Sequence, residues 1–392
     1  IASMTVSPGS SNIAPVAILG GGPVGLTLAL LLARRRVPSV IFDARSVEQA
    51  SADRRLLALS LGSLQTLAAF VELPGNALAS IRTVIVSSVG QFGRAVIDQA
   101  DMGGEMLGAT IRYGDLITTL AAAVNSNGLI SVRRPLKVSL VRQSPSSVEI
   151  ELDPQGSFSA PLALSAEGFG MGATGSTSHA ALVADLEVDG IEHGQARERF
   201  TREGPLALLP LPVRAGSNAH RVALVWCMSS AQAERRSAIS DGEFIDELGA
   251  QLAERKLRVT SMQSRSRYPL HQQARDQLFE HRIVYLGNAA QTLHPVAGQG
   301  LNLGLRDGVV LAEQVGASYA AGADPIQALH AYAQSRRADR AAIVALTRTA
   351  PGFFSTRFAP IALARSIGLT ALAVVPNLRR EFARLLMFGV RF

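Results

Sequence analysis

The sequence predicts an α/β protein in which a parallel-sheet domain is interrupted by a mostly antiparallel sheet and followed by a helical C-terminus. Three observations support this prediction. A strand, a helix and a second strand succeed one another over residues 16–43. Apolar and polar residues alternate over residues 180–189 and 221–229, as expected for strands with one buried face. From Pro325 onward the pattern is mostly helical.

The turn between the first strand and the helix is rich in glycine. Residues 20–25 read GGGPVG, which satisfies the G-x-G-x-x-G pattern. Gly20 permits the tight turn, Gly22 lets a pyrophosphate approach the backbone, and Gly25 lets the helix and the strand pack closely. The start of a helix also supplies N–H groups and partial positive charge for phosphates. The residues of this turn that we expect to contact a dinucleotide are Gly20, Gly22, Pro23, Val24 and Gly25.

An acidic residue follows the second strand at the spacing that such a fold requires. Asp43 lies 23 positions after Gly20, where its carboxylate can accept hydrogen bonds from a ribose, and Ala44 follows it. A second G-x-G-x-x-G match spans residues 170–175. Neither a helix with an apolar face nor an acid at the required distance follows this match, and we interpret it as a flexible glycine loop. The sequence therefore predicts one dinucleotide fold.

The remaining elements follow in order along the chain. Further helices are predicted at about 60–73 and 113–125, with a strand-like stretch at 82–87 between them, and short strands are predicted across 129–152. An apolar strand at 283–286 precedes a long helix that starts near Leu301. The resulting division has dinucleotide-binding segments at 14–75, 101–175 and 281–325, second-sheet segments at 76–100 and 176–280, and a helical region at 326–392.

Composition excludes several classes of protein. Of the 392 residues, 47% are hydrophobic and 18% are charged, as in a globular protein. Cys227 is the only cysteine, so an intrachain disulfide cannot form, and the seven histidines show no metal-binding spacing, so we expect no metal site. No signal peptide or membrane-spanning run is recognisable. We expect a cytoplasmic protein, either free or peripheral on the inner membrane.

The net charge of +7 is concentrated in the last sixth of the chain. Residues 331–392 contain ten arginines and only two acids, Asp339 and Glu381. The preceding residues are nearly neutral, so the high isoelectric point does not indicate nucleic-acid binding. The basic tail needs another explanation.

A long motif in the C-terminal third identifies the family. Residues 285–307 read YLGNAAQTLHPVAGQGLNLGLRD. This segment resembles the flavin motif GDAAHxxPPxxGQGxNxGxxD of single-component aromatic hydroxylases, and within them the ubiquinone-biosynthesis branch. The resemblance implies a para-hydroxybenzoate-hydroxylase-like fold whose Rossmann-like domain binds FAD. It assigns to the cofactor the residues Gly287, Asn288, Pro295, Gly298, Gln299, Gly300, Leu301 and Asn302.

Elementary chemistry agrees with this assignment. An apolar strand delivers Asn288 to the edge of the sheet, where it can bind a ribityl hydroxyl. Gly298 and its neighbours open a long helix, whose N–H groups favour the flavin region that becomes negative on reduction. Pro295 and Gly298 are the candidates for the surroundings of the reactive flavin ring, and no residue is assigned as an acid or base. His294 is interpreted as structural.

Shorter segments also resemble the family. Residues 53–60, DRRLLALS, are similar to a DGRxxALS segment, which places Arg55 near the FAD phosphates. Arg112 matches an RxxxL element that contacts the flavin chain, and Val138 falls on a strand whose backbone meets the adenosine side. Glu167 stands where the family has the aspartate of a DG motif.

The resemblance implies a reaction. NAD(P)H reduces FAD, O2 adds to form a C4a-hydroperoxide, and one oxygen atom is transferred to the ring of a polyprenylated phenol such as 2-octaprenyl-6-methoxyphenol. Two alternatives stay open, a prenyl-chain reductase of the same superfamily and a binding protein that keeps the fold without catalysis. A halogenase is disfavoured because Trp226 is the only tryptophan, which rules out the WxWxIP signature.

The basic tail allows two interpretations. Its helices either pack on the flavin domain with solvated arginines, or bind an anionic membrane surface through an apolar face that includes Leu378, Phe382, Leu385 and Leu386. A long prenylphenol resides in the membrane, which favours the second interpretation. An enzyme complex of the ubiquinone pathway is a further expected partner.

Overall fold

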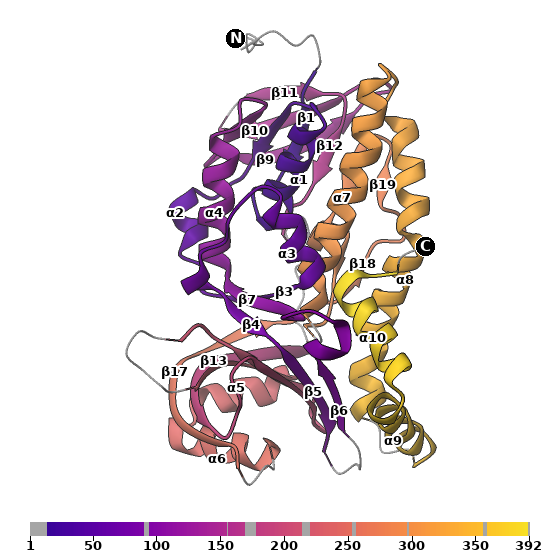
Figure 1. The fold of residues 1–392 in the computed structure, drawn as a ribbon. Helices are drawn as coiled ribbons and strands as arrows, with labels where there is room; N and C mark the ends of the chain where they lie inside the picture. Colours follow the sequence, from indigo (N-terminus) through magenta and orange to yellow (C-terminus); the bar gives the residue numbers. More distant parts are fainter. Residues whose placement is uncertain are drawn as a thin grey trace.

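The computed structural model describes residues 14–89, 94–154, 156–168, 178–213, 220–252, 256–295, 298–355 and 359–390. One domain is built around a parallel sheet, and a second domain is built around an antiparallel sheet (Figure 1). A row of helices, coloured orange to yellow, lies alongside both domains (Figure 1). The second glycine match, at 170–175, lies outside the described residues.

The parallel sheet has the strand order β19-β20-β12-β1-β2-β8, and only β19 is antiparallel to its neighbour. Its strands are β1 (Val16–Leu19), β2 (Ser39–Phe42), β8 (Ile130–Arg133), β12 (Ala163–Ser165), β19 (Phe279–Glu280) and β20 (Ile283–Tyr285). Val16 and Ile18 face a layer of helices, whereas Ala17 and Leu19 face a small second sheet. Burial on both faces explains why β1 is an uninterrupted apolar run.

The helices that cover one face are α1 (Pro23–Arg34), α4 (Tyr113–Asn125) and α7 (Gln299–Ala320). Fully buried leucines, among them Leu28, Leu120 and Leu311, join these helices to the sheet in one core. The other face is covered by a three-stranded antiparallel sheet of β9 (Lys137–Gln143), β10 (Val148–Asp153) and β11 (Ser157–Ala160). The N-terminal strand, helix and strand were thus correctly predicted.

A third sheet lies between the two domains (Figure 1). It consists of β3 (Leu56–Ser60), β7 (Gly108–Arg112) and β4 (Ala79–Ile81), and neighbouring short helices are α2 (Val47–Ser51), α3 (Leu61–Ala68) and η1 (Gly75–Ala77). The helix predicted over 60–73 therefore ends early, at Ala68. Phe70 and Val71 still donate to the Leu67 carbonyl, at 2.9 and 3.0 Å, before the chain turns toward Pro74, which disfavours helical geometry in the residue before it.

The antiparallel sheet has the order β17-β13-β16-β15-β14-β5-β6, with one parallel pair, β14 and β5. Its strands are β5 (Thr83–Ser88), β6 (Arg94–Asp98), β13 (His179–Asp189), β14 (Gln195–Phe200), β15 (Pro205–Pro210), β16 (His220–Ser229) and β17 (Arg258–Pro269). Side chains alternate between its faces. Leu182, Leu208 and Leu224 belong to the core on one face, whereas Ala207 and Val225 line a cavity on the other.

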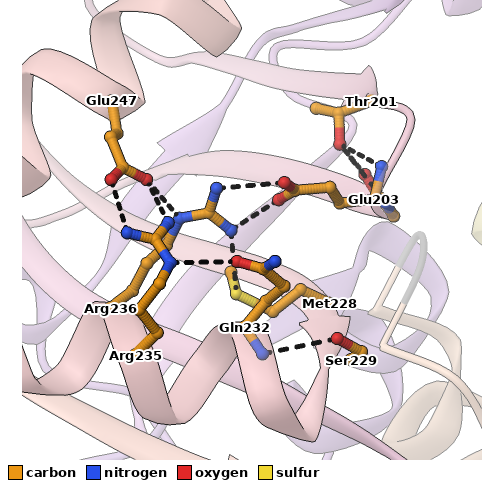
Figure 2. A network of polar contacts seen from close by, with 9 residues as sticks. Thr201, Glu203, Met228, Ser229, Gln232, Arg235, Arg236 and Glu247 are labelled. Carbon is orange, nitrogen blue, oxygen red and sulfur yellow. Dashed lines mark hydrogen bonds and ion pairs between the residues drawn. The ribbon is translucent and has the colours of Figure 1, made fainter.

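Two helices, α5 (Ser230–Ala238) and α6 (Asp241–Leu252), cover the first of these faces, and the sequence did not predict them. A buried arginine fixes them. The Arg236 guanidinium donates to Glu203 at 2.5 Å and to Glu247 at 2.8 Å (Figure 2). It also lies 4.1 Å from the centre of the Trp226 ring. Arg236 thereby joins α5 to α6 and to the β14–β15 turn. The segment was missed because its few apolar residues give only a weak helical pattern.

Two strands lie outside the sheet that the predicted division of the chain gives them. β19 falls in the predicted segment 176–280 but pairs with β20 in the parallel sheet. The predicted second-sheet segment 76–100 contains β4, but β4 pairs with β7 in the third sheet, and only β5 and β6 join the antiparallel sheet. The remaining short elements are η2 (Gln99–Met102), β18 (Gln273–Ala274), η3 (Gly287–Ala289) and β21 (Gln291–Thr292).

The C-terminal helices are α8 (Ile326–Ser355), α9 (Ala359–Val374) and α10 (Pro376–Phe388). Buried charges attach them to α7. Asp307, which ends the long motif, is fully buried and pairs with Arg336 of α8 at 2.6 Å. Asp339 pairs with Arg306 at 3.0 Å and accepts a hydrogen bond from the Val390 N–H at 3.0 Å. The end of the motif therefore fixes α8 and the segment that follows α10.

Candidate active site

The glycine turn before α1 has the geometry that a pyrophosphate requires. Gly20 has a φ of +102°, and a Cβ there would lie 2.8 Å from the Ala166 carbonyl carbon. A Cβ on Gly25 would overlap the carbonyl oxygen of Gly20, and one on Gly22 would lie 3.3 Å from the Tyr113 Oη. Gly22 caps α1 without any side-chain hydrogen bond. The turn thus leaves the start of the helix to a ligand, and a phosphate fits this arrangement.

Asp43 lies at this turn, as its spacing predicts. Its Oδ2 accepts a hydrogen bond from the Gly21 N–H at 2.6 Å, and its Oδ1 accepts one from the Arg45 N–H at 2.7 Å. The Arg134 guanidinium lies 3.5 Å away and donates to the Gly21 carbonyl at 2.8 Å. Because each carboxylate oxygen has a second lone pair, Asp43 can hold the turn and bind a ribose. Ala44, which follows it, is exposed.

Two arginines and a tyrosine gather beside the turn. The guanidinium carbons of Arg45 and Arg55 lie 5.7 and 5.0 Å from the centre of the Tyr113 ring, and Arg45 donates to the Tyr113 Oη at 3.0 Å. Asp53 holds Arg55 through two of its nitrogens. Two positive charges beside an uncapped helix start suit a pyrophosphate. The sequence reasoning named only Arg55, since no motif marks Arg45 or Tyr113.

Arg112 bridges the two domains. Its guanidinium donates to the Asp185 carboxylate of β13 at 2.5 Å and to the Arg54 carbonyl at 2.8 Å. Arg221 also lies 3.7 Å from Asp185. These contacts give Arg112 a structural role at the junction, and its contact with the flavin chain stays a prediction.

Two further predicted residues lie near the same end of the sheet. Val138 is buried in the core between the parallel sheet and the small second sheet, so it could meet a cofactor only through its backbone. Glu167 lies directly under the turn, because a Cβ on Gly20 would be 2.8 Å from its Cα. Burial and the nearby Asp43 carboxylate raise the pKa of Glu167. Its role as a substitute for the family's aspartate stays a prediction.

The fold brings the two motifs into contact. Gly287 has a φ of +55° at the end of β20, and a Cβ on Gly304 of α7 would lie 3.0 Å from both the Gly287 Cα and the Val24 Cγ2. The first motif, the strand end and α7 can approach this closely only because two glycines lack side chains. Asn288 follows Gly287 and is exposed at the strand end, where a ligand can reach it.

The start of α7 is a second uncapped helix end. Gly298 caps it in the left-handed region, with a φ of +59° and no side-chain hydrogen bond, and its N–H donates to the Pro295 carbonyl at 3.0 Å. A Cβ on Gly298 would lie 2.9 Å from the Ala58 Cβ of β3. Gln299, whose side chain donates to the Leu386 carbonyl at 3.2 Å, occupies the first turn, together with Gly300 and Leu301. The N–H groups of this turn fit an anionic ring edge.

Asn302 holds the start of α7 in place. Its Oδ1 accepts a hydrogen bond from the Ser60 N–H at 2.9 Å, and its Nδ2 donates to the carbonyls of Ala58 and Gly298 at 2.9 and 2.8 Å. The residue is only 2% exposed. Its amide therefore joins β3 to the start of α7 and positions Gly298, and its contact with the cofactor stays a prediction.

A cavity of about 330 Å³ adjoins the start of α7. It lies between β3, the turn that contains Pro295 and Gly298, the free face of the antiparallel sheet, and α10. Its apolar lining includes Val84, Ala196, Ala207, Leu209, Val225, Leu293, Leu386 and Met387. The residues predicted to surround the flavin ring thus share one cavity with an aliphatic sheet wall, which suits an apolar aromatic substrate.

The cavity corrects the grouping predicted for the tail. Leu386 lines the cavity, and Met387 beside it is buried, whereas Leu378 is 47% exposed. Arg379 pairs with Asp101 of η2 at 2.7 Å. The four apolar residues of α10 do not form one outward face, because the second half of the helix closes the cavity.

Comparison with known proteins agrees with this arrangement. The FAD binding domain family matches residues 166–347. The ubiquinone hydroxylase UbiL of Rhodospirillum rubrum is 31% identical over 97% of this chain and 90% of its own length. The 3-demethoxyubiquinol 3-hydroxylase of Escherichia coli is 25% identical over 93% of this chain and 96% of its own length.

A solved structure supports the fold. The p-nitrophenol 4-monooxygenase PnpA of Pseudomonas putida superposes with a TM-score of 0.70 and 20% identity, covering 97% of this chain and 99% of its own. The para-hydroxybenzoate-hydroxylase-like fold and the FAD cofactor are therefore confirmed, with NAD(P)H and O2 as the co-substrates of the family. The chain belongs to the FAD-dependent hydroxylases of ubiquinone biosynthesis.

Proposed function

We propose that the protein hydroxylates the ring of a polyprenylated phenol. The observation that supports this proposal is the shared cavity, in which the flavin-motif residues Pro295 and Gly298 lie beside an aliphatic sheet wall. FAD, when bound, takes electrons from NAD(P)H and activates O2. The protein binds the ring and excludes water, which the lining of leucine, valine and alanine side chains favours.

The size of the cavity restricts what it holds. Pockets for small molecules usually measure roughly 300–1,000 Å³, so a cavity of about 330 Å³ accommodates a substituted ring and the beginning of a prenyl chain. The rest of a long chain must leave the cavity. Helix α10, which contributes Ala383, Leu386 and Met387 to the wall, is the element that leads from the cavity to the surface.

The surface next to this wall is apolar. At the junction of α9 and α10, Ile367, Val374, Val375 and Leu378 are 60%, 70%, 44% and 47% exposed, and the exposed Arg380 lies nearby. Among the described residues no helix is long and apolar enough to cross a membrane. Exposed aliphatic side chains beside basic ones suit the interface of an anionic bilayer. We therefore propose that this junction contacts the inner membrane peripherally and receives the substrate there.

Vesicle binding tests the membrane contact. The FAD-bound protein should sediment with vesicles of mixed anionic and neutral lipid, and the double variant Val374→Asp, Leu378→Asp should lose this binding while it keeps FAD. Leu140→Asp is a matched control, because Leu140 is a comparably exposed residue (40%) on β9. Equal sedimentation of all three proteins would contradict the proposal. If the wild type binds no vesicle, the exposed residues at the junction of α9 and α10 would instead suit contact with another enzyme of the pathway.

Isotope labelling tests the reaction. Under ¹⁸O2, the FAD-bound protein with NAD(P)H and a prenylphenol should yield a ring product that contains one labelled oxygen atom, and the phenol should accelerate NAD(P)H oxidation. Mass spectrometry of the product identifies the ring carbon that is hydroxylated. Label found only in peroxide or water, with every prenylphenol offered, would contradict the proposed function.

A further inference from the structure

The cavity contains few polar side chains, and most of them hold the fold together. Asn302 binds backbone groups of β3 and α7, and Gln299 binds the Leu386 carbonyl of α10. The Ser60 hydroxyl donates to Ser63 at 3.2 Å, and Arg197 donates to Gln195 at 2.8 Å. These contacts account for four of the polar side chains that line the cavity.

Glu198 and His294 complete the polar lining, and they come from different walls. Both also have contacts within the fold. Glu198 lies on β14, in register with Ala207 on the sheet wall. His294 lies between Leu293 and Pro295, on the wall that contains the flavin motif. A group that reacts with the substrate during oxygen transfer must reach the ring from a position near the flavin. Of the two residues, His294 has this position.

His294 is suited to receive a proton. It is only 5% exposed, and burial, together with the nearby His179, lowers its pKa to about 4. The imidazole is therefore neutral at physiological pH, and a neutral imidazole has one nitrogen that accepts a hydrogen bond.

The proposed reaction requires a group of this kind. When an electrophilic oxygen adds to the ring, electron density flows from the hydroxyl oxygen into the ring, and the hydroxyl proton becomes strongly acidic. A base of low basicity is then sufficient, provided that it already forms a hydrogen bond with that hydroxyl. The surrounding aliphatic wall excludes water that could replace it.

We propose that His294 binds the ring hydroxyl of the substrate and accepts its proton during oxygen transfer, an inference that rests on the proposed function. The O–H bond of the phenol breaks and an N–H bond forms on the imidazole. The electron pair of the broken O–H bond passes into the phenol ring. When the ring regains aromaticity, a ring carbon loses its proton to solvent and the imidazolium returns a proton to the oxygen. No electrons are gained or lost by the protein.

The test compares His294→Asn with the wild type on two soluble probes, 2-prenylphenol and a ring-fluorinated 2-prenylphenol whose hydroxyl ionises near neutral pH. Asparagine keeps a hydrogen bond but cannot take up the proton. With the first probe, hydroxylation should fall by roughly 10²- to 10⁴-fold, and the consumed O2 should appear as peroxide. With the fluorinated probe most of the activity should return, because its proton has already left.

Further measurements separate this role from a structural one. The wild type should show a solvent deuterium isotope effect on oxygen transfer that is absent from His294→Asn, while FAD affinity and melting temperature stay unchanged. His179→Asn is a matched control, since His179 lies near His294 but does not line the cavity. It should hydroxylate both probes within about twofold of the wild type.

Three results would overturn the inference. They are unchanged hydroxylation in His294→Asn, an equal loss with both probes, and a larger selective loss in Glu198→Gln than in His294→Asn. A wild type that hydroxylates neither of these probes nor any longer prenylphenol would overturn the proposed function itself, and the role of His294 with it.

Discussion

The parallel-sheet domain and the antiparallel sheet both contribute to the site. The first contributes mainly backbone groups, and the second contributes side chains. On the parallel-sheet side the backbone forms the predicted cofactor site, through glycines such as Gly22 and Gly298 at two uncapped helix starts, and of these two Gly298 also lines the cavity. On the antiparallel side aliphatic side chains form it, because Ala207 and Leu209 of β15 and Val225 of β16 face the cavity. A common cofactor needs a fixed backbone, whereas a particular substrate needs an adaptable wall.

The largest effect on stability is expected at Gly25, where the backbone of α1 packs directly against the backbone of the glycine turn. Gly25→Ala places a Cβ on the carbonyl oxygen of Gly20, so strand and helix must separate, and the free energy of unfolding should fall by more than about 4 kcal/mol, with loss of FAD. Gly75→Ala is the control, because no atom lies within 4 Å of the new Cβ. Urea denaturation and flavin absorbance would measure both. A Gly25→Ala protein that binds FAD normally would refute the close packing.

A smaller decrease in the free energy of unfolding is expected when the polar contact that positions Gly298 is removed. Asn302→Leu keeps the branched shape of the side chain but leaves the Ser60 N–H and the carbonyls of Ala58 and Gly298 without their partner, which should cost roughly 3 kcal/mol. FAD should bind more weakly, because the start of α7 is displaced. Titration with FAD checks this prediction, and unchanged FAD affinity would show that Asn302 does not position the turn.

The corresponding contact in the antiparallel domain should affect stability alone. Arg236→Met removes a buried guanidinium from two partly exposed carboxylates, those of Glu203 and Glu247, and should cost about 2 kcal/mol. Arg235→Met is the matched control, since Arg235 also pairs with Glu247 but is exposed, and it should cost at most about 1 kcal/mol. Both variants should keep FAD. Loss of FAD from Arg236→Met would show that FAD binding depends on the stability of the antiparallel domain.

A change in the sheet wall should alter substrate use without affecting the cofactor. Ala207→Phe places a ring in the cavity beside Val225, and the KM for a prenylphenol should rise by roughly tenfold, equivalent to about 1.4 kcal/mol. FAD content should match that of the wild type. Steady-state kinetics would measure the change. An unaltered KM would show that the substrate does not bind beside Ala207.

The smallest effect concerns pH. Hydrogen bonds from Arg235, together with those from Arg236, lower the pKa of Glu247 to about 2. A carboxyl with a lowered pKa in the folded state stabilises the protein above its unfolded value, near 4.3, and this contribution disappears as the pH falls toward 2. Glu247→Gln should therefore be less stable than the wild type at pH 6, with a difference that shrinks below pH 4. A constant difference would contradict the lowered pKa.

The cofactor side could be predicted from the sequence because its requirements are local. Gly20, Gly25 and Asp43 follow from the geometry of one turn, and residues 285–307 form a continuous motif. The substrate side depends on contacts between distant segments. That Leu386 meets Gln299, or that Arg45 lies over Tyr113, follows from the packing of elements far apart in the chain. Helices α5 and α6 were missed because a buried arginine, in place of a clear apolar stripe, fixes them.

A crystal structure of the protein with FAD and 2-prenylphenol would test the shared site most directly. The flavin ring should lie against Pro295 and Gly298 at the start of α7, with its pyrophosphate at Gly22. The phenol should lie between that ring and the wall formed by Ala207 and Val225. A flavin ring away from the start of α7, or a phenol bound outside the cavity, would contradict the proposed site.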